Sequence, residues 1–116
     1  MDNIKGNNYY IEKILEDLKL IVQRMDGIDN EEFSRNDVLQ DSLMFRLVQI
    51  SENTKKLSDE YKEDNPMIPW TAIYGLRNRI VHDYGNIDLS VVIETLRKDI
   101  PELLAEIEKS VGDRRV

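Results

Sequence analysis

Apolar residues recur at intervals of three and four along the first part of the chain. Such intervals place side chains on one face of an α-helix. Gly27 follows the last of them and suits the left-handed conformation that ends many helices. The pattern therefore predicts an amphipathic helix that begins at Tyr9, after a polar lead-in of residues 1–8, and ends near Gly27. Its apolar stripe consists of Ile11, Ile14, Leu15, Leu18, Ile21, Val22 and Met25.

A second helix is predicted from Asn36, whose side chain can cap the first turn. The polar stretch 29–35 before it is expected to form a turn or a single helical turn. Two neighbouring apolar stripes predict that the helix is buried on two sides, in a bundle interior or at a subunit contact. The charged run Lys55–Asp64 is expected to be a solvated face, with docking of a partner protein as the alternative, and Asn65-Pro66 ends regular structure. The stripes are Leu39, Leu43, Ile50 and Leu57, and Val38, Phe45 and Val48.

A third helix is predicted from Pro69, a residue suited to the first helical position, to Tyr84, with Gly85 as its cap. Asp88 can cap a last helical stretch, which Pro101 kinks or interrupts. The apolar positions are Trp70, Ile73, Tyr74, Leu76, Ile80 and Val81 in the third helix, then Val91, Val92 and Leu96, and beyond the proline Leu103, Leu104, Ile107 and Val111.

These four main helices and their short connections predict an all-α fold, an antiparallel bundle of four to five helices. The chain shows no strand-like alternation and no internal repeat. Its 116 residues suit a single domain over residues 1–116, with residues 1–8 and 113–116 expected to be flexible.

The composition excludes several kinds of site. The chain has no cysteine, which rules out disulfides, thiolate metal sites and cysteine nucleophiles and fits a reducing cytoplasm. The N-terminal segment lacks the apolar core of a signal peptide, and no apolar run approaches the ~18 residues that span a bilayer. We therefore expect a soluble cytoplasmic protein without a membrane partner. The net charge of −7 repels nucleic acid at long range, so any RNA binding depends on a local basic site.

The single histidine, His82, lies on the third predicted helix with Arg77 and Asn78. At ~100° per residue, Asn78 and His82 are neighbours on one face, while Arg77 and Tyr84 share a second stripe. Arg77 and His82 are separated by ~140° around the helix and ~7.5 Å along it. One helix therefore makes a poor catalytic site alone. Two such helices that face each other across a twofold axis can bring two arginines and two histidines together.

These residue types suit RNA cleavage without a metal. A neutral imidazole can accept the proton of the attacking 2′-hydroxyl, and a guanidinium binds the oxygens of a phosphorane bidentately. His82 lies near the negative end of the helix dipole, which favours a protonated imidazole and suits a proton donor to the leaving 5′-oxygen. The assignment of acid and base stays open. On spacing alone, a bundle helix with solvated arginines is the simpler interpretation.

A resemblance changes that balance. The segment Ile68–Gly85, I-P-W-T-A-I-Y-G-L-R-N-R-I-V-H-D-Y-G, resembles the signature of HepT-like proteins in the HEPN superfamily. The superfamily motif is an arginine, a polar residue, variable positions and a histidine, which Arg77, Asn78 and His82 match. HepT-type members continue with any residue and then a tyrosine, which Tyr84 matches.

The resemblance covers most of the chain. Trp70 and Gly75 fit the family upstream of the motif, and Ile100–Leu103 resembles its final helix. The segment Phe45–Leu57 resembles the family's second helix, except that Ser51-Glu52-Asn53 stands where the family often has Gly-Glu-Ala. This departure leaves the arginine and histidine intact but puts local packing and substrate contacts in question.

The resemblance implies a homodimeric helical bundle with the motif helix at the dimer interface. Such a protein is a metal-independent endoribonuclease with no cofactor, the toxin of a type VII-like HEPN/MNT toxin–antitoxin system. Its substrate is cellular RNA, such as tRNA or mRNA, and its partner is a small MNT-type nucleotidyltransferase. By this resemblance Arg77 and His82 are catalytic, Asn78 supports them, and the antitoxin can adenylylate Tyr84. An AMP group there would block the groove beside Arg77 and repel RNA.

Two other functions stay open. The chain can be an inactive partner that binds a nucleotidyltransferase and its nucleotide, which the acidic net charge favours, or a dimeric bundle with no site. Arg79 is a weaker candidate for binding phosphate. Glu52 is expected to be an exposed carboxylate rather than a residue that orients Arg77 or Arg79, and Trp70 and Tyr74 are expected to pack.

Overall fold

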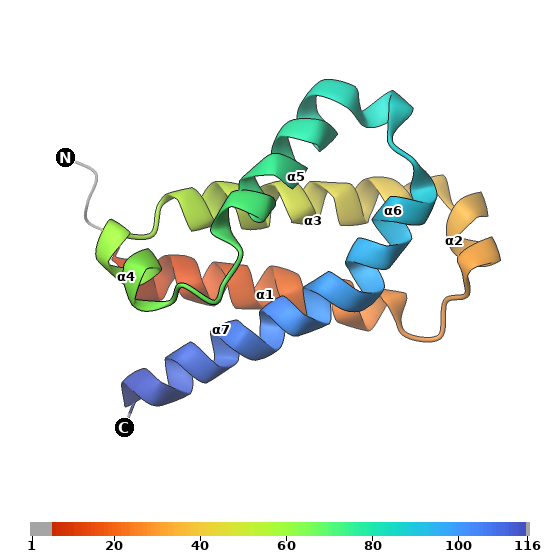
Figure 1. Cartoon of the computed structure of the whole chain (residues 1–116). Helices are drawn as coiled ribbons and strands as arrows, with labels where there is room; N and C mark the ends of the chain where they lie inside the picture. The colour runs from red at the N-terminus through yellow and green to blue at the C-terminus, as the bar shows by residue number, and fades with distance from the viewer. Residues whose placement is uncertain (1–5, 116) are drawn as a thin grey trace.

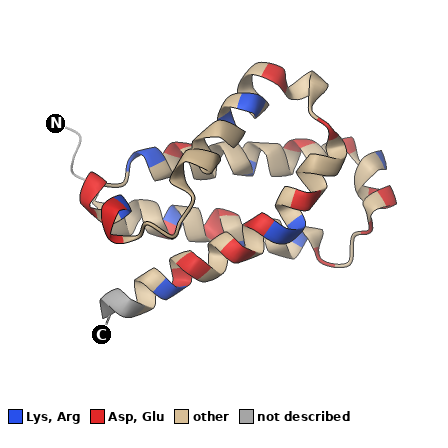
Figure 2. Cartoon of the chain, viewed as in Figure 1, with Lys and Arg blue, Asp and Glu red and all other residues tan. Residues whose placement is uncertain are grey.

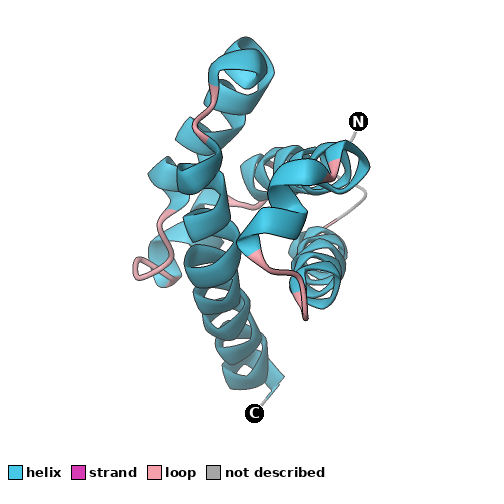
Figure 3. Ribbon diagram, turned by 90° about the vertical axis from the view of Figure 1, so that its right-hand side faces the viewer, coloured by secondary structure: helices cyan, strands magenta, loops and turns pink. Residues whose placement is uncertain are grey.

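The computed structural model describes residues 6–115, with side chains for residues 6–112, and every regular element in that range is helical (Figure 1). The helices are joined by short loops (Figure 3). The predicted all-α bundle is confirmed. The elements are α1 (Asn7–Met25), α2 (Asn30–Arg35), α3 (Asp37–Lys55), α4 (Asp59–Asp64), α5 (Trp70–Asp83), the 3₁₀ turn η1 (Tyr84–Asn86), α6 (Leu89–Glu94), the π-helical segment η2 (Thr95–Asp99) and α7 (Ile100–Arg115).

Side-chain caps fix where the helices begin. Asn36 accepts a hydrogen bond from the Leu39 amide at 2.9 Å, and Asp88 accepts one from the Ser90 amide at 2.9 Å. Both predicted caps are confirmed. Gly27, directly after the residue that caps the end of α1, adopts a φ of 76°, as expected of a glycine that ends a helix.

Gly85 does not act as the predicted cap. It lies inside η1, and among the described residues only Gly27 has a positive φ. The end of α5 instead tightens into a 3₁₀ turn, in which the Ile87 amide donates to the Tyr84 carbonyl at 3.3 Å. A 3₁₀ turn satisfies terminal carbonyls without a left-handed residue, so the prediction for Gly85 is wrong.

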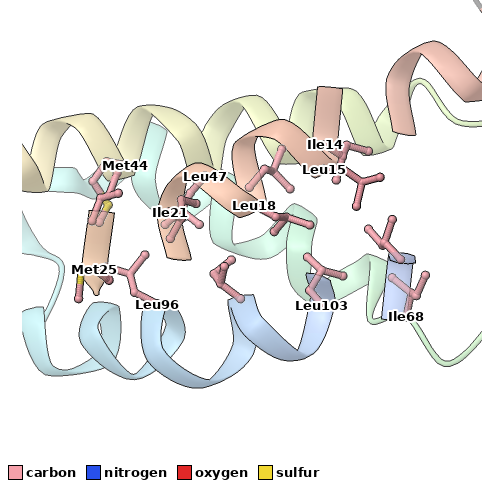
Figure 4. Packing of buried hydrophobic residues seen from close by; sticks show 14 of the residues in the cluster. Ile14, Leu15, Leu18, Ile21, Met25, Met44, Leu47, Ile68, Leu96 and Leu103 are labelled. Carbon is pink, nitrogen blue, oxygen red and sulfur yellow. The ribbon is translucent and has the colours of Figure 1, made fainter. Parts of the chain in front are cut away.

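Helix α1 supplies much of the core because it packs between α3 and α7 (Figure 4). Its predicted stripe is buried except for Val22, which is 36% exposed. The largest side chains that are fully buried come from α1, α2, α3, η2 and α7 and include Ile14, Leu18, Ile21, Phe33, Leu43, Ile50, Leu96 and Ile107.

Helix α3 buries most of one predicted stripe and only part of the other within the chain. Leu43 and Ile50 lie in the core, whereas Val38 is 80% exposed and Phe45 is 55% exposed. Helix α3 nevertheless packs against both α1 and α5, and Val48 of the second stripe is partly buried against the core, so the predicted burial on two sides holds for part of that stripe. A subunit contact over Val38 and Phe45 stays a prediction.

Helices α6 and α7 are joined by η2 into one bent helix (Figure 1). Pro101 causes the interruption, because a proline has no amide hydrogen and its ring clashes with the carbonyl of the preceding turn. Val91 was expected to face the core but is 43% exposed. Thr95 is buried in that region instead, and its hydroxyl donates to the Val91 carbonyl at 3.0 Å.

Helix also covers segments that the sequence pattern leaves out. Asn7 and Asn8 belong to α1, and α7 extends through Arg115; residues 1–5 and 116 lie outside the described residues. The charged run after α3 contains α4, in which Tyr61 is only 5% exposed, so that run is not wholly a solvated face.

Within the described part of the chain, no helix has the length and apolar character needed to cross a membrane.

Candidate functional site on helix α5

One face of α5 is fastened to α3 by three side-chain hydrogen bonds. The Tyr74 hydroxyl donates to the Thr54 carbonyl at 3.5 Å. One turn later Arg77 binds Glu52, and at the far end the Tyr84 hydroxyl donates to Asp41. Because residue numbers rise along α5 as they fall along α3, the two helices run antiparallel.

Arg77 is held in a defined orientation. Its Nε donates to Oε1 of Glu52 at 2.9 Å, and its Nη1 donates to Oδ1 of Asn78 at 3.3 Å. The Arg77 side chain is 26% exposed and that of Glu52 is 40% exposed, while Lys55 lies at 4.0 Å from the same Glu52 oxygen. The interpretation of Glu52 as an unengaged exposed carboxylate is therefore wrong. Its position on α3, opposite Arg77, makes it the residue that orients the guanidinium.

His82 has different surroundings. It is exposed in the last turn of α5, and among the described residues it makes no hydrogen bond and no ion pair. No interaction between described residues links it to Arg77. One chain thus presents the two groups on different faces of one helix, as the sequence geometry predicts, and does not by itself bring them together.

Tyr84 faces α3 on the same side of α5 as Arg77. Partial burial, then the hydrogen bond to Asp41 and the negative charges of Asp41 and Asp37, raise the pKa of Tyr84 to about 12. The tyrosine is therefore protonated at neutral pH and acts as a hydrogen-bond donor to Asp41. This contact ties the end of α5 that carries His82 to the first half of α3.

Comparison with known proteins places this helix in a family. The family described as "Ribonuclease HepT-like" matches residues 11–110. This range includes the whole of α5 and of α3, the helix to which α5 is bonded. The chain belongs to the HepT-like family. No solved structure matches it.

Several relatives of this HepT-like chain are similar over nearly their full length. "Putative RNase TTE0752" of Caldanaerobacter subterraneus subsp. tengcongensis is 32% identical over 100 residues, 86% of this chain and 89% of the relative. "Probable ribonuclease HepT" of Thermococcus cleftensis is 31% identical over 105 residues, 90% of this chain and 96% of the relative. "Putative RNase MJ1216" of Methanocaldococcus jannaschii is 31% identical over 104 residues, covering 90% and 86%.

Three further candidate residues lie on α5. Arg79 is charged, and Trp70 and Tyr74 are aromatic residues that pack against the rest of the chain. Arg79 is exposed on another face of α5 and forms no ion pair with a described residue. The Trp70 indole donates to the carbonyls of Lys62 and Asn65, each at 3.2 Å, so Trp70 anchors the start of α5 as expected. Tyr74 packs beneath Lys62, whose amine lies 5.5 Å from the ring centroid.

Asp41 is the neighbour of the motif that the sequence pattern missed. It lies 43 positions before Tyr84, in a different helix, so nothing local marks it. A signal was available in principle, because Glu52 and Asp41 are eleven residues apart, which is three turns of helix, and so share a face. Among the described side chains, no group of three histidines or carboxylates lies close enough together to assign to a metal ion.

Proposed function

We propose that this HepT-like chain is a metal-independent endoribonuclease and the toxin of a type VII-like toxin–antitoxin pair. The observation that carries the proposal is that α5 presents both an Arg77 oriented by Glu52 and an exposed His82 that has no partner among the described residues. The family membership and the ribonuclease names of the relatives support it. The proposed substrate is RNA, such as tRNA or mRNA, and the proposed location is the cytoplasm.

The chemistry follows from the two side chains. One imidazole removes the proton of a ribose 2′-hydroxyl, whose oxygen attacks the adjacent phosphorus. The bond from phosphorus to the 5′-oxygen breaks, and that oxygen takes up the proton that the imidazole has removed, which leaves a 2′,3′-cyclic phosphate and a 5′-hydroxyl. Arg77 balances the charge of the phosphorane. Because Glu52 occupies Nε, the Nη nitrogens are the ones directed to phosphate oxygens.

A homodimer completes the site in this proposal. The outer face of α5 carries Thr71, Gly75, Asn78 and His82, which are exposed and include no carboxylate. A Cβ added at Gly75 would meet nothing within 4 Å, so there is room for a second helix to approach closely. A twofold axis beside this face brings His82 of one chain toward Arg77 of the other. Asn78 supports the site through its hydrogen bond with Arg77.

The proposed partner is an MNT-type nucleotidyltransferase that silences the toxin at Tyr84. The tyrosine oxygen attacks the α-phosphorus of ATP, pyrophosphate leaves, and the hydroxyl proton is released. Modification removes the hydrogen bond to Asp41 and places a phosphate next to Asp41 and Asp37. Like charges repel at that distance, so the modified end of α5 would lose its attachment to α3, and the AMP group would obstruct RNA.

The test is cleavage of total RNA and of tRNA by the purified chain in EDTA. We expect fragments that end in 2′,3′-cyclic phosphate, and we expect His82→Ala and Arg77→Ala to abolish them. Lys109→Ala, an exchange at an exposed position on α7, serves as the control and should cleave normally. Absence of cleavage by the wild-type chain, or cleavage by His82→Ala at the wild-type rate, contradicts the proposal.

The alternative is an inactive partner that binds a nucleotidyltransferase and its nucleotide. The net charge of −7 favours it, because an acidic surface repels RNA. This alternative predicts a stable complex with the neighbouring nucleotidyltransferase and normal growth when the chain is expressed alone. Growth arrest that depends on His82 would exclude it.

A further inference from the structure

An apolar groove runs along a face of α5 that α3 does not cover. Ile73 and Leu76 line it from α5, and Ile100 and Leu103 line it from α7, around a volume of about 520 Å³. Met67, at the mouth of the groove, is 82% exposed. A second hollow continues the groove toward Val91 and shares Leu76 with it. We call the two together the α5–α7 groove.

The rim of the α5–α7 groove is acidic. Asp99, Glu102 and Glu106 line it from η2 and α7, and acidic residues recur along α7 in Figure 2. Asp83 and Asp88 line the continuation. None of these carboxylates forms an ion pair with a described residue. Arg79 is the one basic residue among the described residues that line either hollow. This rim repels RNA, so the groove is not an extension of an RNA site.

A second copy of the chain is a poor occupant for this groove. A twofold contact sets the same surface of two molecules against each other. Here that would oppose Asp99, Glu102 and Glu106 to their own counterparts, in a chain whose net charge is −7. Like charges brought together at an interface cost free energy. The outer face of α5, which carries no carboxylate, has no such penalty and is the better surface for a copy.

We propose that the α5–α7 groove is the docking site for a basic amphipathic helix of a protein partner. The apolar face of that helix packs on the apolar side chains that line the groove, as in other helix-in-groove contacts. Its lysines or arginines meet Asp99, Glu102 and Glu106. Helix α5 spans ~21 Å, which accommodates about four turns of a partner helix. A helix in this position contacts α5 without covering the face that carries His82. The proposal requires no RNA cleavage and goes beyond the proposed function.

The probe is a synthetic 18-residue helix of leucine and lysine with one apolar stripe. Two control peptides keep its length: a scrambled peptide of the same composition, and one with glutamate in place of lysine. Binding to the full chain is measured by fluorescence anisotropy at 150 mM salt. We expect the amphipathic basic peptide to bind at least tenfold more tightly than either control peptide.

Two double variants separate the groove from the overall charge. Glu102→Lys with Glu106→Lys reverses the rim, and we expect at least a tenfold loss of affinity for the basic peptide. Glu12→Lys with Glu63→Lys makes the same change in net charge at exposed positions away from the groove, and we expect less than a threefold loss. Ala72→Trp fills the groove from an exposed position on α5 and should weaken binding at least tenfold without a change in charge. Circular dichroism confirms that each variant is folded.

Three results would overturn the proposal. Equal losses in the two double variants would show attraction to the net charge alone. Equal binding of the scrambled peptide would show that the groove does not select a helix. A change of self-association on reversing the rim, measured by sedimentation, would assign the groove to a second copy. If the wild-type chain cleaves no RNA but these binding results hold, the proposed function fails and the docking site stands.

Discussion

Arg77 and His82 are five positions apart on one helix, yet their surroundings differ in kind. Arg77 is fastened by Glu52 and Asn78, whereas His82 has no partner among the described residues. A phosphate-binding guanidinium gains from being fixed in advance, because orientation then costs nothing during the reaction. An imidazole that must exchange protons with the substrate works best when no other side chain forms a hydrogen bond with its nitrogens. The difference fits the separate roles proposed for the two residues.

Glu52→Ala should lower activity through Arg77 rather than through substrate binding. Without Glu52 the guanidinium loses the contact to its Nε and samples other orientations. We expect kcat for RNA cleavage to fall about tenfold, which is less than the roughly 10²–10³-fold loss on removing a stabilising donor itself, because Arg77 remains present, while KM changes less than threefold. Glu52→Gln keeps an oxygen acceptor and should recover most of kcat. Lys55→Ala removes the other neighbour of Glu52 and serves as the control.

Single-turnover and steady-state kinetics on a defined RNA separate these quantities. A purely structural role for Glu52 predicts a lower melting temperature and equal effects in the alanine and glutamine variants. Equal kcat values for wild type and Glu52→Ala would contradict a positioning role.

The proton on Tyr84 gives a second test at the residue scale. The pKa of Tyr84 is raised to about 12, first by burial and then by Asp41. A folded-state pKa above the unfolded value of about 10 means that the contribution to stability is present below pH 10 and is lost as the pH rises toward 12. Absorbance titration of wild type minus Tyr84→Phe should therefore show tyrosinate appearing near pH 12. Asp41→Asn should move that step down toward pH 10.

The folded state must be followed by circular dichroism in the same titration. A wild-type difference signal centred near pH 10, with the fold intact, would show that Tyr84 is not held against Asp41. Tyr84→Phe should also melt at a lower temperature than wild type at neutral pH, because it leaves Asp41 without its donor.

At the scale of the element, periodicity predicts the long helices and fails for the short helix α4. Helix α1 has a single stripe of apolar residues over its whole length, so its existence and its buried face follow from spacing. Helix α4 has six residues, and all of them except Tyr61 are charged. It also has too few turns to show a period. Its stability comes from Tyr61, which is buried and bonded to Ser110 at 2.7 Å. That contact is fixed by tertiary structure and cannot be inferred from local spacing.

N-cap residues are the second local feature of the sequence that predicts where a helix begins, as Asn36 and Asp88 do here. Asn36 allows a quantitative test of this contribution. Its side chain accepts the Leu39 amide hydrogen at 2.9 Å. Asn36→Ala should lower the free energy of unfolding by about 1 kcal/mol, the usual cost of losing such a cap. Asn36→Asp keeps the acceptor and should change it by less than about 0.5 kcal/mol. Urea denaturation followed by circular dichroism measures both, and equal loss in the two variants would show that the cap does not stabilise α3.

At the scale of the whole molecule, the sequence carries less information about contacts between helices. The motif and the shared stripe of Arg77 and Tyr84 follow from spacing, but their partners Glu52 and Asp41 depend on how α5 lies on α3. The same holds for the α5–α7 groove, which exists because the bend at Pro101 sets the course of α7. Exposed apolar residues such as Phe45 and Val38 also have no explanation within one chain. They fit an assembly in which α3 and α5 meet a second copy.

Mixing two inactive variants tests that assembly directly. Arg77→Ala retains His82, and His82→Ala retains Arg77, so a mixed dimer contains one site with both groups and one with neither. Random pairing makes half of the dimers mixed, so activity should recover to about a quarter of the wild-type value under a twofold-symmetric shared site. RNA cleavage after the two variants are unfolded together and refolded measures the recovery, and each variant refolded alone is the control. No recovery, in a mixture that sedimentation shows to be dimeric, would place both groups of a working site on one chain.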